Sequence, residues 1–314
     1  MPTRPATDAI LQEALDIYEQ TGDYVSAAKK MGVPKQTGRD RITQARLRGL
    51  RPTVRKDAPR VYTRERLGRM HMFLPDGQCK PGVTDEHWEW AGNYAAEKKP
   101  DVIVNAGDMW DMPSLSSYDK GKMAFEGRRY INDIKAGQAA MMKFLKPIED
   151  YNRTATEKYE PRLVFTMGNH EHRIIRYVEN NPEFAGKFSF GDLELREMGW
   201  EVHDFLKPVE IDGILYCHFF TSGVMGRPVT SAAALLRERQ QSCTMGHVQW
   251  FDIATHKKTQ ATALFGGIFY QHDEDYLGYQ GNNCKRGIII KHEVENGIYD
   301  LMQVSLRFLK KNYT

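Results

Sequence analysis

Five apolar runs in this sequence each end in side chains that can bind a metal ion or transfer a proton. They are LPDGQ with Asp76 and Gln78, NAGDMWD with Asp108 and Asp111, TMGNHE with Asn169 and His170, LYCHFF with His218, and TMGHVQ with His247 and Gln249. A single histidine beside a strand is more often a packed or surface residue than a ligand. Carboxylates, amides and imidazoles gathered at several strand ends suit divalent cations. The five runs together therefore favour a metal centre.

The segments around these runs alternate between strand-like and helix-like patterns. Strands are expected in RMHMFLPDGQ, DVIVNAGDMWD and RLVFTMGNHE, and helices in TDEHWEWAGNYAAEKK and over residues 123–150. Beyond residue 200 we expect further strands (WEVHDFL, GILYCHFF, ATALFGGIFY, RGIIIKHEV and IYDLMQVSL) and one helix, TSAAALLRERQQ. Alternation of this kind predicts an α/β body.

A basic segment precedes this body. Residues 29–60 hold eleven Lys or Arg and two Asp, a net charge of +9, whereas the whole chain carries +3. Such an uneven distribution favours a polyanion-binding module joined to a mildly acidic domain. The alternative is a solvated basic tail.

The N-terminal segment also has helical periodicity. It predicts a helix over 8–20, a short helix capped by Asp23 and ended by Gly32, and a third helix over 35–49 with Ile42, Ala45 and Leu47 inward. Two short helices with a tight turn resemble a helix-turn-helix, whose second helix enters the DNA major groove. The candidate DNA-binding side chains are Lys35, Arg39, Arg41, Arg46 and Arg48. Gly38 in the third helix counts against this interpretation, and the alternative is a helical packing or dimerisation unit.

The motifs GDxxD, GNHE, a later His and GHxQ resemble the signature of calcineurin-like metallophosphoesterases, over residues 68–305. The whole chain is also similar to bacteriophage-encoded proteins with a helix-turn-helix before such a domain. The resemblance implies a two-sheet β-sandwich flanked by helices, the αββα arrangement, with two metal ions at the strand ends. Residues 50–67 lack clear periodicity and hold two prolines, so together with the resemblance we expect three parts of the chain: a helix-turn-helix-like domain (1–50), a linker (51–67) and the phosphoesterase domain (68–314).

The resemblance also implies a role for each motif residue. Asp108 would bridge both metals, Asn169, His218 and His247 would complete the second site, and Asp76 would bind the first. His170 would not be a ligand: held by Asp111, it would stabilise or protonate the leaving oxygen. A carboxylate beside His170 would favour its protonated form.

The chain departs from the family pattern at two positions, both belonging to the first metal. The usual DxH is Asp76-Gly77-Gln78 here, and the usual GHxH ends in Gln249. If both glutamines bind through oxygen, the first site is all oxygen, which favours Mn²⁺ or Mg²⁺ over Zn²⁺; Fe²⁺ is a further alternative. We expect one tight and one weak site, and the competing interpretation is a single-metal or decayed site.

These observations predict a metal-dependent phosphoesterase that uses a hydroxide activated by two metals. The basic segment favours a DNA phosphodiesterase, that is, a nuclease. The alternatives are a phosphomonoesterase or nucleotide phosphatase, and a DNA-binding protein with a structural metal site. A homodimer is compatible with a helix-turn-helix.

Composition indicates the cellular compartment in which we expect the protein. No run of about 18 apolar residues predicts a membrane helix, and the first residues lack the apolar stretch of a signal peptide. The four cysteines are far apart and form no CxxC pair. These features predict a cytoplasmic protein, in the host cytoplasm if it is phage-encoded.

Overall fold

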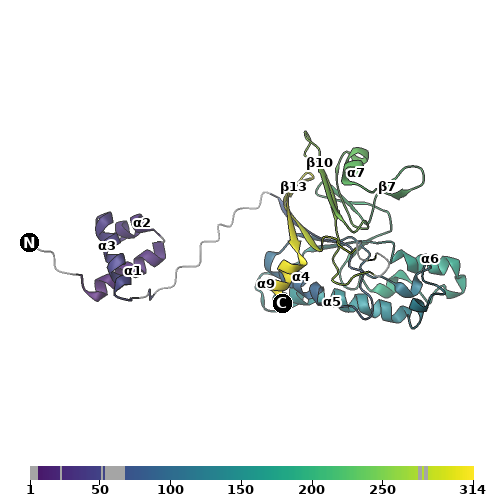
Figure 1. The fold of residues 1–314 in the computed structure, drawn as a ribbon, viewed down its shortest axis with the longest axis horizontal. Coiled ribbons are helices and arrows are strands. Elements are labelled where there is room, and N and C mark those ends of the chain that lie inside the picture. The colour runs from purple at the N-terminus through teal and green to yellow at the C-terminus, as the bar shows by residue number, and fades with distance from the viewer. Residues whose placement is uncertain (1–5, 22, 51, 54–67, 275–277, 279–281) are drawn as a thin grey trace, which may run out of the picture. The chain divides into compact units, whose positions relative to one another are not determined.

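The computed structural model describes residues 6–21, 23–50, 52–53, 68–274, 278 and 282–314. Contacts divide the chain into two compact units, Met1–Glu65 and Arg66–Thr314, and each is described by itself (Figure 1). Apart from Pro52 and Thr53, the linker predicted over 51–67 lies outside the described residues.

The N-terminal unit contains three helices, α1 (Asp8–Thr21), α2 (Tyr24–Lys30) and α3 (Lys35–Leu47). They share a small core of Leu11, Ala14, Leu15, Ala27, Ile42 and Ala45. The expected cap of α2 is confirmed, because the Asp23 carboxylate accepts the backbone N–H groups of Val25 and Ser26, both at 2.9 Å. That the unit is a helix-turn-helix stays a prediction.

One expectation about α3 was wrong. Leu47, expected inward, is 75% exposed, because two residues beyond buried Ala45 the helix has turned by about 200°. Gly38 lies at the contact between α2 and α3. A Cβ atom there would lie 2.8 Å from the Cβ of Ala28, so the absence of a side chain lets α2 and α3 approach.

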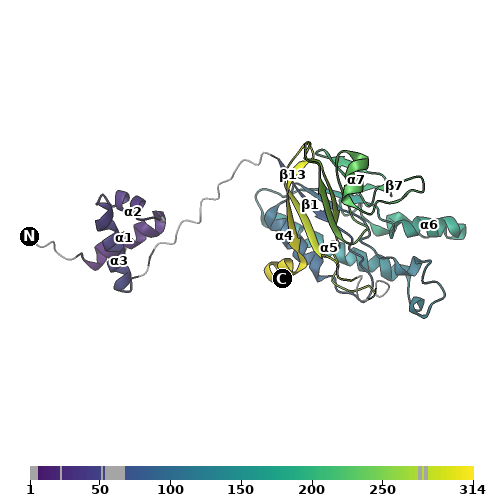
Figure 2. The same cartoon turned by 45° about the horizontal axis from the view of Figure 1, so that its top comes forward.

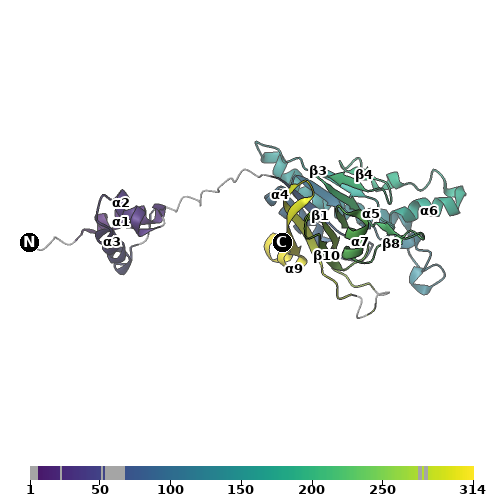
Figure 3. The same ribbon diagram turned by 90° about the horizontal axis from the view of Figure 1, so that it is seen from above.

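The larger unit has a six-stranded sheet in the order β13-β12-β1-β2-β3-β4. Its strands are β1 (Arg69–Leu74), β2 (Val102–Asn105), β3 (Arg162–Thr166), β4 (Glu201–His203), β12 (Gly287–Glu295) and β13 (Ile298–Ser305). β1 to β4 are parallel neighbours, and β12 pairs antiparallel with β1 and with β13. Figure 3 shows β3 beside β4. The carboxyl ends of β1, β2 and β3 therefore lie at the same edge.

A second, five-stranded sheet has the order β10-β11-β9-β6-β5. Its strands are β5 (Val209–Ile211), β6 (Ile214–Cys217), β9 (Ser242–Met245), β10 (Phe251–Thr255) and β11 (Thr262–Gly266). β6, β9 and β11 are parallel. Phe73 and Val164 of the first sheet share one apolar cluster with Tyr216 and Leu264 of the second, so the two sheets pack against each other.

Helices cover the outer faces of both sheets. α4 (Glu86–Lys98) and α5 (Tyr130–Thr154) pack on the six-stranded sheet, where Trp88 and Phe144 join Met72 and Phe165 in one cluster (Figure 2). α7 (Ala232–Arg239) covers the second sheet through Leu235. The predicted mixed α/β body is confirmed.

Some predicted boundaries were wrong. The helix expected over 123–150 is α5, which begins at Tyr130; it follows a short 3-10 turn, η2 (Met123–Phe125), and Gly127 at φ +78°. α6 (His172–Asn180) and α9 (Leu306–Tyr313) were not predicted. The remaining elements are β7 (Thr221–Ser222), β8 (Arg227–Pro228), η1 (Pro113–Leu115), η3 (Pro182–Phe184) and η4 (Phe190–Leu193). None of the described helices has the length and apolar character needed to cross a bilayer.

Candidate metal centre

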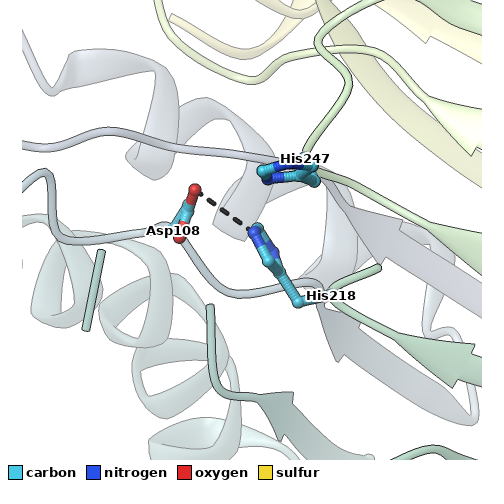
Figure 4. A group of neighbouring side chains, drawn as sticks. All are labelled: Asp108, His218 and His247. Atoms are coloured by element: carbon cyan, nitrogen blue, oxygen red, sulfur yellow. Dashed lines mark ion pairs between the residues drawn. The ribbon is translucent and has the colours of Figure 1, made fainter. Parts of the chain in front are cut away.

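Three of the predicted metal ligands converge from separate loops. Asp108, His218 and His247 each offer one ligand atom, and these atoms lie within 4.8 Å of one another (Figure 4). Asp108 follows β2 of the first sheet, whereas His218 and His247 follow β6 and β9 of the second. The cluster exists only because the two sheets pack with these strand ends side by side.

The surroundings of His218 require a positive charge at its ring. Its Nδ1–H donates to the carbonyl of Ala106 at 2.8 Å, which turns Nε2 toward Asn169 Oδ1 at 2.9 Å and Asp108 Oδ2 at 3.3 Å. A ring nitrogen that faces two oxygens must carry a proton or bind a cation. Burial opposes the charge, but the Asp108 carboxylate raises the pKa of His218 to about 9.

The residues of the predicted first site are buried and incompletely paired. Asp76 Oδ1 accepts the backbone N–H of His247 at 2.8 Å. Asp76 Oδ2, Gln78 Oε1 and His247 Nδ1 are buried and have no hydrogen-bond partner in the part of the chain that the structure describes. Leaving such groups unpaired is costly. Asp76 and Gln78 belong to the predicted first site and His247 to the second, and a divalent cation at each site would satisfy these atoms, so the residues present fit metal ions.

Electrostatics agree with this fit. Burial, and then the neighbouring Asp108 carboxylate, raises the pKa of Asp76 to about 7. Like charges this close favour a bound cation or proton. Gln249 is half-buried two residues beyond His247.

The backbone is strained at four predicted ligands. Gln78, Asp108, His247 and Gln249 have φ values of 40°, 49°, 67° and 53°, in the left-handed region that side chains rarely adopt. Each such residue costs about 1–3 kcal/mol and persists only where the surrounding structure imposes it. Strain gathered at these positions points to a functional site.

Glycines in the motifs make room for the carboxylates. A Cβ atom at Gly168 would lie 2.2 Å from Asp108 Oδ1, and one at Gly246 would lie 2.3 Å from Asp76 Oδ1. Neither position can therefore accept a side chain without displacing a predicted ligand.

His170 lies beside the cluster with Asp111 against its ring. Nδ1 is 2.9 Å from Asp111 Oδ1 and 2.8 Å from the Asp111 carbonyl oxygen. The backbone N–H of His170 donates to Asp108 Oδ1 at 2.8 Å. Burial opposes protonation, but Asp108 and Asp111 raise the pKa of His170. Nδ1–H donates to Asp111, so Nε2 bears a proton only in the charged ring, and the neighbouring Arg173 guanidinium opposes that charge.

Glu171, to which the sequence assigned no role, ties two of the loops together. The side chain is fully buried, and its Oε2 accepts the N–H groups of Asp108 at 2.9 Å and Gly168 at 3.0 Å. Its Oε1 accepts the N–H of Trp110 at 2.9 Å. The sequence signal that could have identified Glu171 was its place in the GNHE motif, directly after Asn169 and His170. Glu171 is a positioning residue.

Arg173 and Lys80 were also missed. Arg173 lies one turn beyond His170, and its Nη2 is 3.1 Å from His170 Nε2, while Nη1 donates to the Asp111 carbonyl at 2.7 Å. Lys80 Nζ lies 3.1 Å from Asp111 Oδ2. Only the fold brings Lys80 to this place.

A cavity of about 1060 Å³ adjoins His170 and Asp111. Its lining includes Asn169, His170, Asp111 and Arg173. It provides access to the predicted catalytic side chains from solvent.

The five candidate DNA-binding side chains lie along α3 and at its end. Lys35, Arg39, Arg46 and Arg48 are exposed and Arg41 is half-buried. The Arg39 and Arg46 guanidinium groups lie 5.9 Å and 4.9 Å from the ring centroids of Tyr24 and Tyr18. Arg48 pairs with Asp8 at 2.6 Å. Their role in DNA binding stays a prediction.

Comparisons with known proteins add little to this geometry. No family model matches the sequence, and no curated protein is similar to it. Among solved structures, the chain is similar to a conserved uncharacterized protein, a predicted phosphoesterase, from Streptococcus pneumoniae TIGR4, at 12% identity and a TM-score of 0.31. The match covers 75% of this chain and 98% of that one. A TM-score this low does not define a common fold, so the assignment of function depends on the chain's own residues.

Proposed function

We propose that this protein is a metal-dependent phosphoesterase of the calcineurin-like type, and that its layers of helix, sheet, sheet and helix are the αββα fold of that family. The convergence of Asp108, His218 and His247 from two sheets carries the proposal. The unpaired buried oxygens of Asp76 and Gln78 support it.

In this proposal the loops hold two divalent ions. Asp108, Asn169, His218 and His247 would hold one ion, and Asp76, Gln78 and Gln249, together with Asp108, would hold the other. When bound, the ions would supply positive charge to the phosphate and lower the pKa of a bound water.

The chain's own residues then act on the substrate. Asp111 accepts the Nδ1–H of His170 and so fixes the ring, which presents Nε2–H to the leaving oxygen. Arg173, whose Nη2 lies 3.1 Å from Nε2 in the free protein, turns to the phosphoryl oxygens and neutralises their charge, which leaves Nε2–H facing the leaving oxygen.

The two sites are proposed to be unequal. Two imidazoles make the second site tight, whereas the first offers amide oxygens in their place. Neutral oxygen ligands bind more weakly and favour Mn²⁺ or Mg²⁺. We propose Mn²⁺ as the working metal.

The substrate is proposed to be DNA, with α3 and its arginines holding the nucleic acid. Exposed arginines on one short helix suit contacts to phosphates, which confer affinity that falls steeply with salt. The reaction is then the hydrolysis of phosphodiester bonds.

The test compares the wild type with Asp108→Asn, in Mn²⁺, on bis-p-nitrophenyl phosphate and on linear and circular DNA. Removing the shared carboxylate charge is expected to lower kcat at least 100-fold on every substrate. Asp204→Asn, at an exposed aspartate paired with Lys207, is the matched control and should retain full activity.

Different outcomes separate the alternatives. Activity that survives in Asp108→Asn would refute the metal centre. Hydrolysis of the small diester without DNA cleavage would refute the nuclease assignment alone. Faster turnover of phosphate monoesters would support a phosphatase, and DNA binding without hydrolysis under any metal would support a binding protein.

A further inference from the structure

The cavity beside His170 continues to the loop between η1 and α5. Its far lining includes Tyr118, Lys122 and Arg129. Cavities of about 300–1,000 Å³ enclose drug-sized ligands, so a volume of about 1060 Å³ accommodates more than the phosphate alone. The substrate group attached to that phosphate must therefore occupy the rest.

Most charges around this cavity are already compensated within the protein. Lys80 contacts Asp111 at 3.1 Å and Glu274 at 2.6 Å, and Arg128 contacts Asp119 at 2.7 Å. The cavity is consequently not a basic channel along its whole length. A ligand with few charges and an uncharged, planar part suits this cavity. The two phosphate backbones of a duplex, with their many negative charges, suit it less.

Two side chains at the mouth remain available to a ligand. Tyr118 is 83% exposed, and its ring stacks on no other aromatic ring among the described residues. Arg129 is exposed, and its Nη1 donates to the carbonyl of Arg128 at 2.8 Å. Arg129 contacts no carboxylate within the described ranges. Both side chains line the same cavity as His170, so a ligand that fills the cavity can reach an aromatic face and a guanidinium group.

We infer that this cavity is a subsite for an unpaired nucleotide next to the cleaved phosphate, with its base stacked on Tyr118 and its outer phosphate on Arg129. The inference rests on the proposed phosphoesterase function and names the substrate class of that site. Every base has a π-face, so stacking on tyrosine tolerates any sequence. Bases of an intact duplex are paired and stacked, so the subsite selects single strands or frayed ends.

The experiment measures kcat/KM in Mn²⁺ for the full chain on three substrates: a single-stranded oligothymidylate, the same strand in a duplex, and an abasic oligomer of equal length. Because α3 is proposed to hold duplex DNA independently of this cavity, each variant is compared with the wild type on the same substrate. Tyr118→Ala is expected to lose about 10-fold on oligothymidylate and nothing on the abasic oligomer, because base–aromatic stacking is worth about 1–3 kcal/mol. Arg129→Ala is expected to lose activity on both single strands.

Phe308→Ala and Arg153→Ala are the matched controls. Phe308 is 47% exposed on α9, and the Arg153 side chain is 72% exposed at the end of α5; neither lines the cavity. Both should behave as the wild type on all three substrates.

Equal losses by Tyr118→Ala on the oligothymidylate and the abasic oligomer, or no loss on either, would overturn the inference. An equal loss by Tyr118→Ala on the duplex and on the single strand would also overturn it. If bis-p-nitrophenyl phosphate is hydrolysed while neither single strand is cut, the inference fails and the phosphoesterase proposal stands. If the small diester is not hydrolysed either, both fail.

Discussion

Individual residues at the candidate site have conformations and contacts that folding alone does not favour. Four predicted ligands have positive φ, and Asp76 and Gln78 have buried oxygens without partners among the described residues. These features lower stability. They are explained if the side chains bind cations, because the free energy of metal binding then offsets the cost of the strained backbone and the unpaired oxygens.

Glu171 provides the residue-scale prediction. A glutamine there has one acceptor oxygen for three N–H donors that the carboxylate now satisfies. We expect Glu171→Gln to lower the stability of the fold by about 1–3 kcal/mol and to weaken metal binding about 10- to 100-fold.

Calorimetric titration with Mn²⁺ measures this effect. The wild type should bind two ions with unequal affinity, and the variant should bind both more weakly. Glu179→Gln, at the exposed far end of α6, is the control. Two equally tight sites in the wild type would contradict the unequal pair, and unchanged binding in Glu171→Gln would contradict its positioning role.

At the scale of elements, α3 presents cations on both sides of its buried stripe. Taking 100° per residue, Lys35, Arg39 and Arg46 lie on the flank near Tyr24, and Arg41 and Arg48 lie on the other. In the proposed DNA complex, each flank would contact phosphates. Contacts of Arg39 and Arg46 with tyrosine rings hold these two guanidinium groups in place.

Salt dependence tests the role of α3. The logarithm of DNA affinity should fall linearly with the logarithm of salt concentration, by about 0.9 per phosphate contact. Arg39→Ala with Arg46→Ala should therefore reduce that slope by about 2 and weaken binding to every sequence alike. Arg153→Ala with Arg307→Ala, both exposed in the larger unit, is the matched control. An unchanged slope would remove α3 from the interface.

For the larger unit as a whole, a buried polar network joins the two sheets. His71 of β1 contacts the Tyr216 hydroxyl of β6 and Asp212 Oδ2, both at 2.8 Å. Lys291 of β12, also fully buried, donates to Tyr216 at 3.2 Å and to Thr244 of β9. Buried polar groups must find these partners, so the network favours one alignment of the sheets and thereby brings Asp108 close to His218.

The network makes stability depend on pH. Burial lowers the pKa of His71 to about 4, against 6.5 in an unfolded chain. Between these values the unfolded state binds more protons, so stability is complete above about pH 6.5 and falls as the pH falls toward 4. From pH 7 to pH 5 we expect His71 to account for a loss of about 2 kcal/mol.

Urea unfolding at the two pH values checks this expectation. All five tryptophans, at positions 88, 90, 110, 200 and 250, belong to the larger unit, so their fluorescence reports on that unit. His87, whose pKa burial lowers to about 3, contributes with the same sign in every variant. His71→Gln should therefore lose about 2 kcal/mol less than the wild type, and equal losses would show that His71 is not responsible.

Local sequence determined the parts of this protein that depend on near neighbours. The α/β alternation, the helices of the N-terminal unit and the Asp23 cap follow from periodicity and capping chemistry within a few residues. Each motif was located correctly at the end of its strand, because a polar run after an apolar one ends burial. The start of α5 was misplaced, because apolar spacing continued through a turn at Gly127.

Only the tertiary structure decided which of these side chains meet. Strand order brings β12 beside β1 and sets β6 and β9 next to each other, and no local pattern encodes pairing between segments so far apart. The two sheets must pack before Asp108 can approach His218 and His247. Glu171 and Lys80 acquire their partners in the same step. Short motifs thus determine which side chains the site contains. Its geometry depends on the long-range burial of two apolar faces, which periodicity alone cannot specify.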